Sequence, residues 1–423
     1  MRTKNIRERV RKKLVDVAII FRNFCYVQLP LFWMRLRLPL VSATENTFLI
    51  LPCDPDYPHG SFGDVAMLMG LMQSIARMYP NARFTIVGRR MAQLTFPSIG
   101  VVDVVNAWDS VRNFDRLTRR HKALFALGAD VMDGAYGAAM VCRAVTYCNH
   151  AARRGIPATI LGFSFSRTPR FPTVHVLSRM HPGVRLNVRD AFSLERFTAA
   201  THTPARLAAD VAFLMAPATA LSGDVLSWVE DMRRQGKMVV GVNLSTHALA
   251  SIVAMRGACY LVKSVAEQLK LAGNRLPLAY VLIPHDVKPL AGDVKLLKDL
   301  DVALRDTGFP FVQYSIQEDP ASVKLLVSRL DLVLTSRMHL AISSLGVGTP
   351  TLCIVYKDKF EGLYAHFDLP PDTLIQGATI RIETLAEQLM QAIAGRAAAR
   401  TRILEKRPAV LELAQRNLDA LVS

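Results

Sequence analysis

Arg337 and His339 stand where an α/β protein can carry out chemistry. They follow the apolar run Leu332–Leu334, and a helical pattern continues from them to Gly346. This pattern predicts a strand and then a helix, so the guanidinium and imidazole groups come at the carboxyl end of a strand, where open α/β sheets bind ligands. The N–H groups at the start of the helix favour an anion there. Taken alone, such a pair is more often a solvated helix start and a packed imidazole.

A second arginine, Arg189, has the same setting earlier in the chain. It follows the strand-like run Arg185–Val188 and precedes Asp190 and a helical pattern. Two guanidinium groups facing one cleft suit an anion that bears both a carboxylate and a phosphate, because each group can form two parallel hydrogen bonds. The sequence equally allows Asp190, or Asp210 at the next short apolar run, to pair with Arg189 for structural reasons.

A glycine-containing loop, His59–Asp64, follows the first predicted strand and opens a helix. Gly63 allows the backbone to approach a ligand closely, and Ser61 and Asp64 place a hydroxyl and a carboxylate beside it. The carboxylate could orient a sugar hydroxyl, or Gly63 and Asp64 could only cap the helix. The loop is neither a Walker loop nor a complete dinucleotide-binding fingerprint.

Polar side chains also follow other predicted strands of the second half. Asn243 comes directly after Met238–Val242, and His285 follows Ala279–Ile283. The remaining candidates for substrate binding are Met338, Lys357 and Lys359, of which the two lysines would extend a basic rim.

Short apolar runs alternate with helical patterns from Thr47 onward, which is typical of βαβ units in parallel sheets covered on both faces. At 423 residues the chain exceeds one ordinary core. We predict an α/β protein with two Rossmann-like lobes: a basic amphipathic N-terminal segment (1–45), an N-terminal lobe (46–215), a C-terminal lobe (216–365) and a helical tail (366–423). The predicted strands are 48–51, 84–87, 101–105, 123–127, 158–161 and 185–188 in the first lobe and 238–242, 279–283, 311–314, 332–335 and 351–355 in the second.

Composition indicates a globular protein, since 51% of the residues are hydrophobic and 21% are charged. The net charge is +17, and residues 1–44 contribute eight of it, with ten Lys or Arg against two acidic residues. No helix-turn-helix, zinc-finger or aromatic RNA-binding signature accompanies this charge, so nucleic acid is not an expected partner. The six cysteines are scattered without metal-binding spacing, which predicts reduced thiols in a cytosolic protein and no metal site.

The N-terminal segment carries a basic cluster followed by two apolar stretches, Leu14–Phe21 and Cys25–Met34. Neither stretch reaches the ~20 apolar residues that span a bilayer, and no small-residue cleavage site follows them. Two interpretations remain open. The segment is either a monotopic anchor that contacts an anionic membrane surface through residues 1–40, or a basic solvated tail followed by a part that packs on the domain.

The order of these motifs resembles the polysaccharide pyruvyl transferase family over roughly residues 47–365. Each motif is short, and their order and spacing carry the specificity. The loop at 52–59 is longer and more polar than the Gly- and Asn-rich entry usual in the family, and the first forty-odd residues have no family counterpart. The similar segments are Gly60-Ser-x-Gly-Asp64, Val188-Arg-Asp-x-x-Ser193, Asp210-x-Ala-Phe213, Ser336-Arg-x-His339, Gly346-x-Gly-x-Pro350 and Tyr356-x-x-Lys359.

The resemblance implies a two-lobed fold like that of GT-B glycosyltransferases. It also implies transfer of pyruvate from phosphoenolpyruvate to two hydroxyls of a sugar, giving a cyclic ketal and phosphate, with Arg189, Arg337 and His339 as donor-binding and catalytic positions. We expect His339 to be the general acid and Asp64 or Asp190 to deprotonate the acceptor hydroxyl. No metal or cofactor is expected beside the donor, since the arginines neutralise its charge.

The expected acceptor is a sugar of a cell-envelope or secreted polysaccharide, carried on a lipid, and the expected location is the cytoplasm at the inner face of the cytoplasmic membrane. Two other functions fit the same sequence. A GT-B glycosyltransferase with a nucleotide-sugar donor would share the lobes and the cleft. A non-catalytic, membrane-associated scaffold of polysaccharide assembly would need its cations only for solubility.

Overall fold

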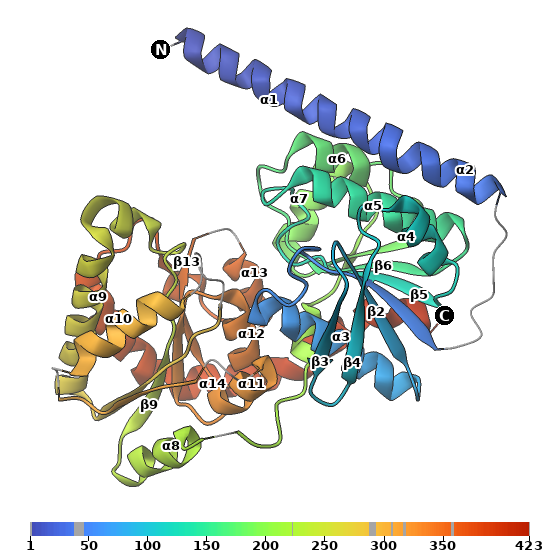
Figure 1. Ribbon diagram of the computed structural model, residues 1–423. Helices are drawn as coiled ribbons and strands as arrows, with labels where there is room; N and C mark the ends of the chain where they lie inside the picture. The colour runs from blue at the N-terminus through green and yellow to red at the C-terminus, as the bar shows by residue number, and fades with distance from the viewer. Residues whose placement is uncertain are drawn as a thin grey trace. The chain divides into compact units, whose positions relative to one another are not determined.

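The computed structural model describes residues 2–37, 46–221, 223–286, 293–305, 308–315, 319–356 and 359–422. The chain forms two compact units. Unit 1 comprises Met1–Pro58, Leu71–Val211 and Leu413–Ser423, and unit 2 comprises His59–Gly70 and Ala212–Glu412. Each unit contains one β-sheet with helices around it (Figure 1), so the predicted α/β class with two Rossmann-like lobes is confirmed. The exact boundaries of the predicted domains stay a prediction.

Unit 1 is built on an eight-stranded sheet with the order β3-β4-β2-β1-β5-β6-β7-β8. Neighbouring strands are parallel except for β3 and β4, which form an antiparallel pair. The strands are β1 (Thr47–Leu51), β2 (Arg83–Gly88), β3 (Ala92–Phe96), β4 (Gly100–Asn106), β5 (Ala123–Ala126), β6 (Ala158–Phe163), β7 (Val184–Val188) and β8 (Arg206–Leu207).

The helices of unit 1 bury the central strands on both faces, which explains why β1, β5 and β6 are almost continuously apolar. Tyr147 stacks on Phe114 inside this core, with 3.6 Å between ring centroids. The C-terminal end of the chain also packs here, because Asn417 accepts a hydrogen bond from the backbone N–H of Gly162 at 2.8 Å. The helices are α3 (Phe62–Met78, from Leu71 on), α4 (Val111–Thr118), α5 (Ala138–Arg153), α6 (Phe171–Leu177), α7 (Ala191–Thr201) and the 3-10 helix η5 (Arg416–Leu421).

The N-terminal segment is helical from α1 (Arg2–Asn23) through a π-helical turn, η1 (Phe24–Gln28), to α2 (Leu29–Arg37). Within it, Val10–Arg37 is long and apolar enough to cross a membrane by length and composition alone. Each of the two apolar stretches alone is shorter than the ~20 residues that span a bilayer. The helix continues through Arg22 and joins them.

Unit 2 contains a six-stranded, fully parallel sheet with the order β11-β10-β9-β12-β13-β14. Its strands are β9 (Met238–Val242), β10 (Leu278–Leu282), β11 (Phe311–Gln313), β12 (Leu332–Thr335), β13 (Thr351–Val355) and β14 (Ile375–Gln376). Its helices are η2 (Val211–Leu214), α8 (Val225–Arg234), α9 (Ala250–Arg275), α10 (Val294–Arg305), α11 (Pro320–Val327), α12 (Met338–Gly346), α13 (Phe360–Ala365), η3 (Pro371–Thr373), η4 (Ile382–Thr384) and α14 (Leu385–Gln415).

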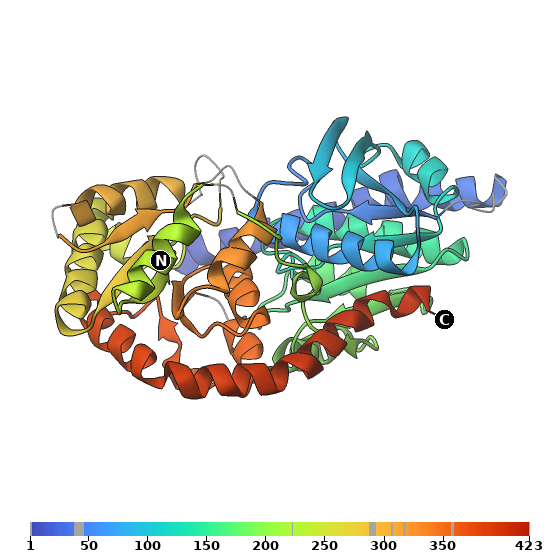
Figure 2. The ribbon, with the colours of Figure 1, turned by 90° about the horizontal axis from the view of Figure 1, so that it is seen from below.

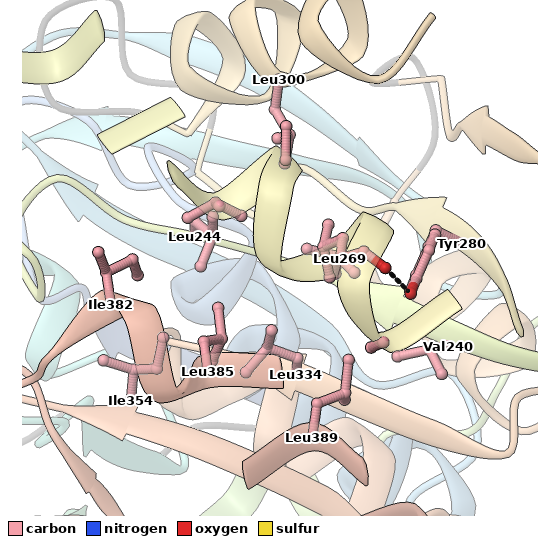
Figure 3. Packing of buried hydrophobic residues seen from close by; sticks show 14 of the residues in the cluster. Val240, Leu244, Leu269, Tyr280, Leu300, Leu334, Ile354, Ile382, Leu385 and Leu389 are labelled. Carbon is pink, nitrogen blue, oxygen red and sulfur yellow. Dashed lines mark hydrogen bonds between the residues drawn. The ribbon is translucent and has the colours of Figure 1, made fainter. Parts of the chain in front are cut away.

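A large apolar cluster holds α9 and the start of α14 against one face of this sheet. Leu269 of α9 and Leu385 of α14 lie in the same cluster as Val240 and Leu334 of the central strands (Figure 3). Tyr280, fully buried on β10, donates its hydroxyl to the carbonyl of Leu269 at 2.6 Å. Burial of that hydroxyl is therefore compensated by a hydrogen bond. Figure 2 shows α14 in red as a long helix at the C-terminal end of the chain.

Among the described residues, eleven of the fourteen strands coincide with predicted strands and three do not. β3 is an exposed edge strand, while β8 and β14 have only two residues each, so none has the apolar run that marks a buried strand. Helix α12 begins at Met338, which places His339 within its first turn.

Lys324 of α11 is a buried cation inside unit 2. Its ammonium group donates hydrogen bonds to the carbonyls of Phe213 at 3.0 Å and Met215 at 2.6 Å. Burial lowers the pKa of Lys324 to about 7, with a smaller contribution from the positive charge of Arg407. In the unfolded chain this pKa returns to its ordinary value of about 10.4. The unfolded state therefore binds the extra proton between these two values.

We expect the free energy of unfolding to rise with pH across this window, by up to about 1.4 kcal/mol per pH unit from this group. Replacing Lys324→Met should flatten that rise. Lys263→Met, at an exposed lysine of α9, should leave it unchanged. Chemical denaturation at several pH values above about 7 measures the slope. Equal slopes for the wild type and the Lys324 variant would contradict the assignment.

Candidate active site

The candidate site of unit 2 lies at the carboxyl end of its sheet. The chain enters the sheet at the central strand β9, continues to β10 and β11 on one side, and then returns to β12 and β13 on the other. The loops after β9 and β12 therefore diverge at a topological switch point, where open α/β sheets bind ligands. Asn243 follows β9, and Thr335, Ser336 and Arg337 end and follow β12.

Arg337 is held between two carboxylates. Its Nε and Nη2 donate to Oδ1 of Asp293 at 2.9 and 2.6 Å, and its Nη1 lies 3.0 Å from Oδ2 of Asp286. Burial acts to lower the pKa of Arg337, but Asp293 and Asp286 outweigh it and raise the pKa above its ordinary value. The guanidinium is therefore charged and fixed in orientation.

Asp293 is fully buried and joins Arg337 to the neighbouring strand ends. Its second oxygen accepts hydrogen bonds from Nδ2 of Asn243 at 2.8 Å and from the backbone N–H of His285 at 3.3 Å. Asn243 in turn accepts a hydrogen bond from the hydroxyl of Thr335 at 3.0 Å. Burial raises the pKa of Asp293, although Arg337 and Asn243 oppose the shift. One network thus connects β9, β10 and β12.

His339 lies directly against the backbone of Gly63 at the start of α3. A Cβ atom added to Gly63 would lie 2.2 Å from Nδ1 of His339 and 2.7 Å from its Cγ. A side chain of any size at position 63 would overlap the imidazole ring. The predicted close backbone approach at Gly63 is therefore made to a side chain of the protein itself.

Ser61 and Asp64 form a reciprocal cap at the first turn of α3. The backbone N–H of Asp64 donates to the Ser61 hydroxyl at 3.1 Å, and that hydroxyl donates to the Asp64 carboxylate at 2.8 Å. The first of these bonds is that of an N-cap, but the carboxylate accepts from the Ser61 hydroxyl and not from its backbone N–H as in a capping box. Both side chains are half-buried, beside the glycine that contacts His339.

His285 is a buried imidazole that packs against the first residue of α3. Its ring meets the ring of Phe62 edge to face, with 5.7 Å between centroids. Burial holds the pKa of His285 well below its ordinary value, helped by the charges of His339 and Arg337, so the ring is neutral at pH 7. In the described part of the chain neither ring nitrogen of His285 has a hydrogen-bond partner, and the same holds for the hydroxyl of Ser336. These three polar atoms can therefore form hydrogen bonds with a bound ligand.

The remaining candidates of unit 2 have different surroundings. Met338 is buried in the apolar core. Lys359 is also buried, with its ammonium 4.9 Å from the ring centre of Tyr356 and 3.3 Å from the Tyr356 hydroxyl. Lys357 lies outside the described residues.

In unit 1, Arg189 follows β7 as predicted and is almost completely buried. Its Nη1 lies 2.8 Å from Oδ2 of Asp210, and its Nε donates to the Ser164 hydroxyl at 2.7 Å. Of the two ion-pair partners that the sequence left open, the structure has Asp210.

Asp190 caps helix α7. Its carboxylate accepts a hydrogen bond from the backbone N–H of Ser193 and another from the Ser193 hydroxyl, both at 2.7 Å. The side chain is 2% exposed. Its observed role is structural, and a catalytic role for Asp190 stays a prediction, as does joint binding of one donor by Arg189 and Arg337.

Sequence reasoning missed three members of the unit 2 network: Asp286, Asp293 and Thr335. Asp286 belongs to a polar cluster after β10 and Thr335 ends β12, so the strand ends themselves were the available signal. Asp293 precedes α10 and reads as an ordinary helix start. Among the described residues, no group of three His, Cys, Asp or Glu side chains could hold a metal ion.

Solved structures with similar folds define the class. A protein from Listeria monocytogenes described as a UDP-N-acetylglucosamine 2-epimerase has a TM-score of 0.58 at 10% identity, covering 89% of this chain and 96% of that one. The UDP-GlcNAc 2-epimerase of Neisseria meningitidis gives 0.51 at 9%, covering 89% and 99%. The trehalose-6-phosphate synthase OtsA gives 0.53 at 9%, covering 89% and 98%. The chain has the two-lobed GT-B fold of such glycosyltransferases and epimerases.

The family within this fold follows from the sequence. The family model described as "Polysaccharide pyruvyl transferase" matches residues 62–358, well over half of the chain. The chain therefore belongs to the polysaccharide pyruvyl transferase family, as its motif order predicted. No curated protein matches it in sequence.

The contact between Gly63 and His339 yields a prediction about stability. Gly63→Ala improves helix propensity but places a methyl group inside the imidazole ring, so we expect a net loss of about 1–3 kcal/mol. Gly395→Ala, in open space on α14, should instead be neutral or stabilising by up to about 1 kcal/mol. Chemical denaturation compares the two variants. If Gly63→Ala were as stable as Gly395→Ala, position 63 would not constrain His339.

Proposed function

We propose that the chain transfers the pyruvyl group of phosphoenolpyruvate to two hydroxyls of one sugar, forming a cyclic ketal and releasing phosphate. Membership of the polysaccharide pyruvyl transferase family supports the reaction class. The observation that carries the assignment to a site is the placement of His339, which is fixed against Gly63 and follows the carboxylate-bound Arg337 at the switch point of the unit 2 sheet.

The reaction begins with a proton transfer to carbon. His339 gives a proton to the methylene carbon of the donor, which becomes a methyl group, and the positive charge develops on the neighbouring carbon. The first sugar hydroxyl attacks that carbon and loses its proton to a base. A histidine suits the first step, because its ordinary pKa lies near neutral pH and allows it to act as an acid and to be recharged.

The second half of the reaction releases phosphate. The bond between the carbon and the phosphate oxygen breaks, and the second hydroxyl attacks the same carbon and loses its proton. Of the two hydroxyl protons, one balances the new methyl group and the other leaves with phosphate. Arg337 and the neighbouring start of α12 favour the anionic groups of the donor.

Asp64 is the carboxylate that the geometry favours as the base. It is half-buried, one residue from the glycine that contacts His339, whereas Asp190 is buried and caps α7. The neutral ring of His285 and the hydroxyl of Ser336 would hold the sugar or donor through the hydrogen bonds that no described residue supplies to them. We infer that the acceptor belongs to a cell-envelope or secreted polysaccharide and is carried on a lipid.

Phosphate release distinguishes this function from its rivals. With phosphoenolpyruvate and a panel of lipid-linked and nucleotide-linked sugars, we expect phosphate to appear together with a product heavier than the acceptor by one pyruvate ketal. Phosphoenolpyruvate should also raise the unfolding temperature. A nucleotide-sugar glycosyltransferase would be protected by a nucleoside diphosphate and not by phosphoenolpyruvate, and a non-catalytic scaffold by neither. Either pattern would overturn the proposal.

His339 provides a sharper test at the level of one residue. His339→Ala should lower the rate of phosphate release about 10²–10⁴-fold, because the proton donor is lost. His247→Ala, at an exposed histidine of the same unit, should leave the rate unchanged. Circular dichroism and the unfolding temperature confirm that each variant folds. A folded His339 variant with nearly normal turnover would show that the imidazole only packs.

A further inference from the structure

One side of the N-terminal helix packs against the rest of unit 1 through polar and apolar contacts. Asp16 accepts a hydrogen bond from Arg170 at 2.5 Å, and Asn23 donates to the hydroxyl of Thr146 at 3.0 Å. Further along, Val27 and Leu31 are buried in the unit 1 core. These contacts run along α5 and α6, where Figure 1 shows the blue helix.

The outward side of the same helix carries many exposed apolar side chains. Of the 23 large apolar side chains that are exposed in the described part of the chain, eleven belong to residues 10–36. Leu14, Val17, Phe21 and Phe24 follow one another at spacings of three and four residues, which forms a continuous stripe on one helix face. Five of the eleven are aromatic: Phe21, Phe24, Tyr26, Phe32 and Trp33. An exposed apolar surface of this kind marks a contact with a partner or a membrane.

Positive charge surrounds this stripe. The first thirteen residues contain seven Lys or Arg and one acidic residue, and the described members Arg11, Lys12 and Lys13 are exposed. Arg35 and Arg37 lie at the other end of the helix and contact the rings of Phe32 and Trp33. The apolar stripe is therefore flanked by cations at both ends.

Two clefts beside the helix are lined by further arginines. The larger, about 440 Å³, lies between the helix, α5 and α6 and is lined in part by Arg153, His175 and Arg179. The smaller, about 360 Å³, shares Arg153 and includes Arg35 and His150. No carboxylate lines either cleft, and within the described residues none of the arginines at 35, 153 and 179 pairs with one. Burial and the charge of Arg35 lower the pKa of Arg153, as expected for cations without a counter-ion.

We propose that this face of unit 1 docks on a bilayer containing anionic lipids, with the N-terminal helix lying in the plane of the interface. Its aromatic and aliphatic side chains enter the boundary between headgroups and acyl chains, and the basic residues bind headgroup phosphates. Amphipathic helices with aromatic residues and flanking cations bind membranes in this way.

Two other occupants of this face fit the observations less well. A helix that crossed the bilayer would have to leave unit 1, which would separate Asp16 from Arg170 and Asn23 from Thr146. A second copy of the chain would bring two strongly positive surfaces together, and like charges oppose that contact. An anionic lipid surface satisfies both the apolar stripe and the unpaired arginines.

Co-sedimentation of the full-length chain with vesicles tests the proposal. We expect binding to phosphatidylcholine vesicles only when phosphatidylglycerol is added, and release by high salt or alkaline carbonate. Phe21→Asp should weaken binding more than about tenfold. The substitution removes an aromatic ring that would be buried in the lipid and adds a negative charge. Val302→Asp, at an equally exposed valine of α10 in unit 2, should have no effect.

The charge contribution is tested separately. Neutralising Arg11, Lys12 and Lys13 together to Gln should weaken binding about a hundredfold, whereas changing the exposed Lys263, Lys270 and Lys298 to Gln should not. Unfolding temperatures establish that the variants fold. Resistance of the bound protein to carbonate would indicate a spanning helix. A lipid-free dimer that Phe21→Asp dissociates would indicate a second copy. Either result, or binding unchanged by both sets of variants, would overturn the proposal.

Discussion

The ion pair between Arg337 and its two carboxylates is the interaction on which the candidate site depends. Asp286 follows β10, Asp293 precedes α10, and Arg337 follows β12, so one guanidinium joins segments that are far apart in sequence. Buried ion pairs add little net stability, but removing one partner is strongly destabilising. The pair therefore acts mainly by fixing geometry, since it holds the residue that immediately precedes α12, two positions before His339.

The two strand-end arginines follow the same physical rule. Arg189 in unit 1 and Arg337 in unit 2 follow the end of a buried parallel strand by one and two residues, and each is compensated by a carboxylate. A bare guanidinium in such a position would carry a large desolvation penalty. The carboxylates stabilise each charged guanidinium in the absence of a ligand. An anionic donor would therefore bind to an arginine that already has a carboxylate partner.

Much of this arrangement could be predicted from the sequence, because the buried strands are apolar and the polar residues at their ends stand out. His339 and Gly63 were found in this way, through a strand end and a helix-opening glycine. Their direct contact could not be predicted, since it joins residues 276 positions apart and depends on tertiary packing. The capping role of Asp64 had been left open beside a catalytic role, because a helix-start carboxylate looks the same in both cases. For Asp190 the alternative to catalysis was an ion pair with Arg189, and its role as the cap of α7 was not predicted.

The π-helical turn at Phe24–Gln28 has a consequence for the evolution of the N-terminal helix. A π-turn contains one residue more than the α-helical turn it replaces, and each α-helical residue turns the helix by about 100°. The π-turn therefore takes up one residue while the helix on either side keeps its direction, so that Asn23 and Leu31 both face inward. A one-residue deletion within the turn would restore regular α-helix and leave Phe32 and Trp33 facing as before relative to Phe21. The same deletion in the α-helical part between Phe21 and the turn would rotate them by about 100°. The π-turn is thus a place where the length of this helix can change without turning its lipid-facing side chains.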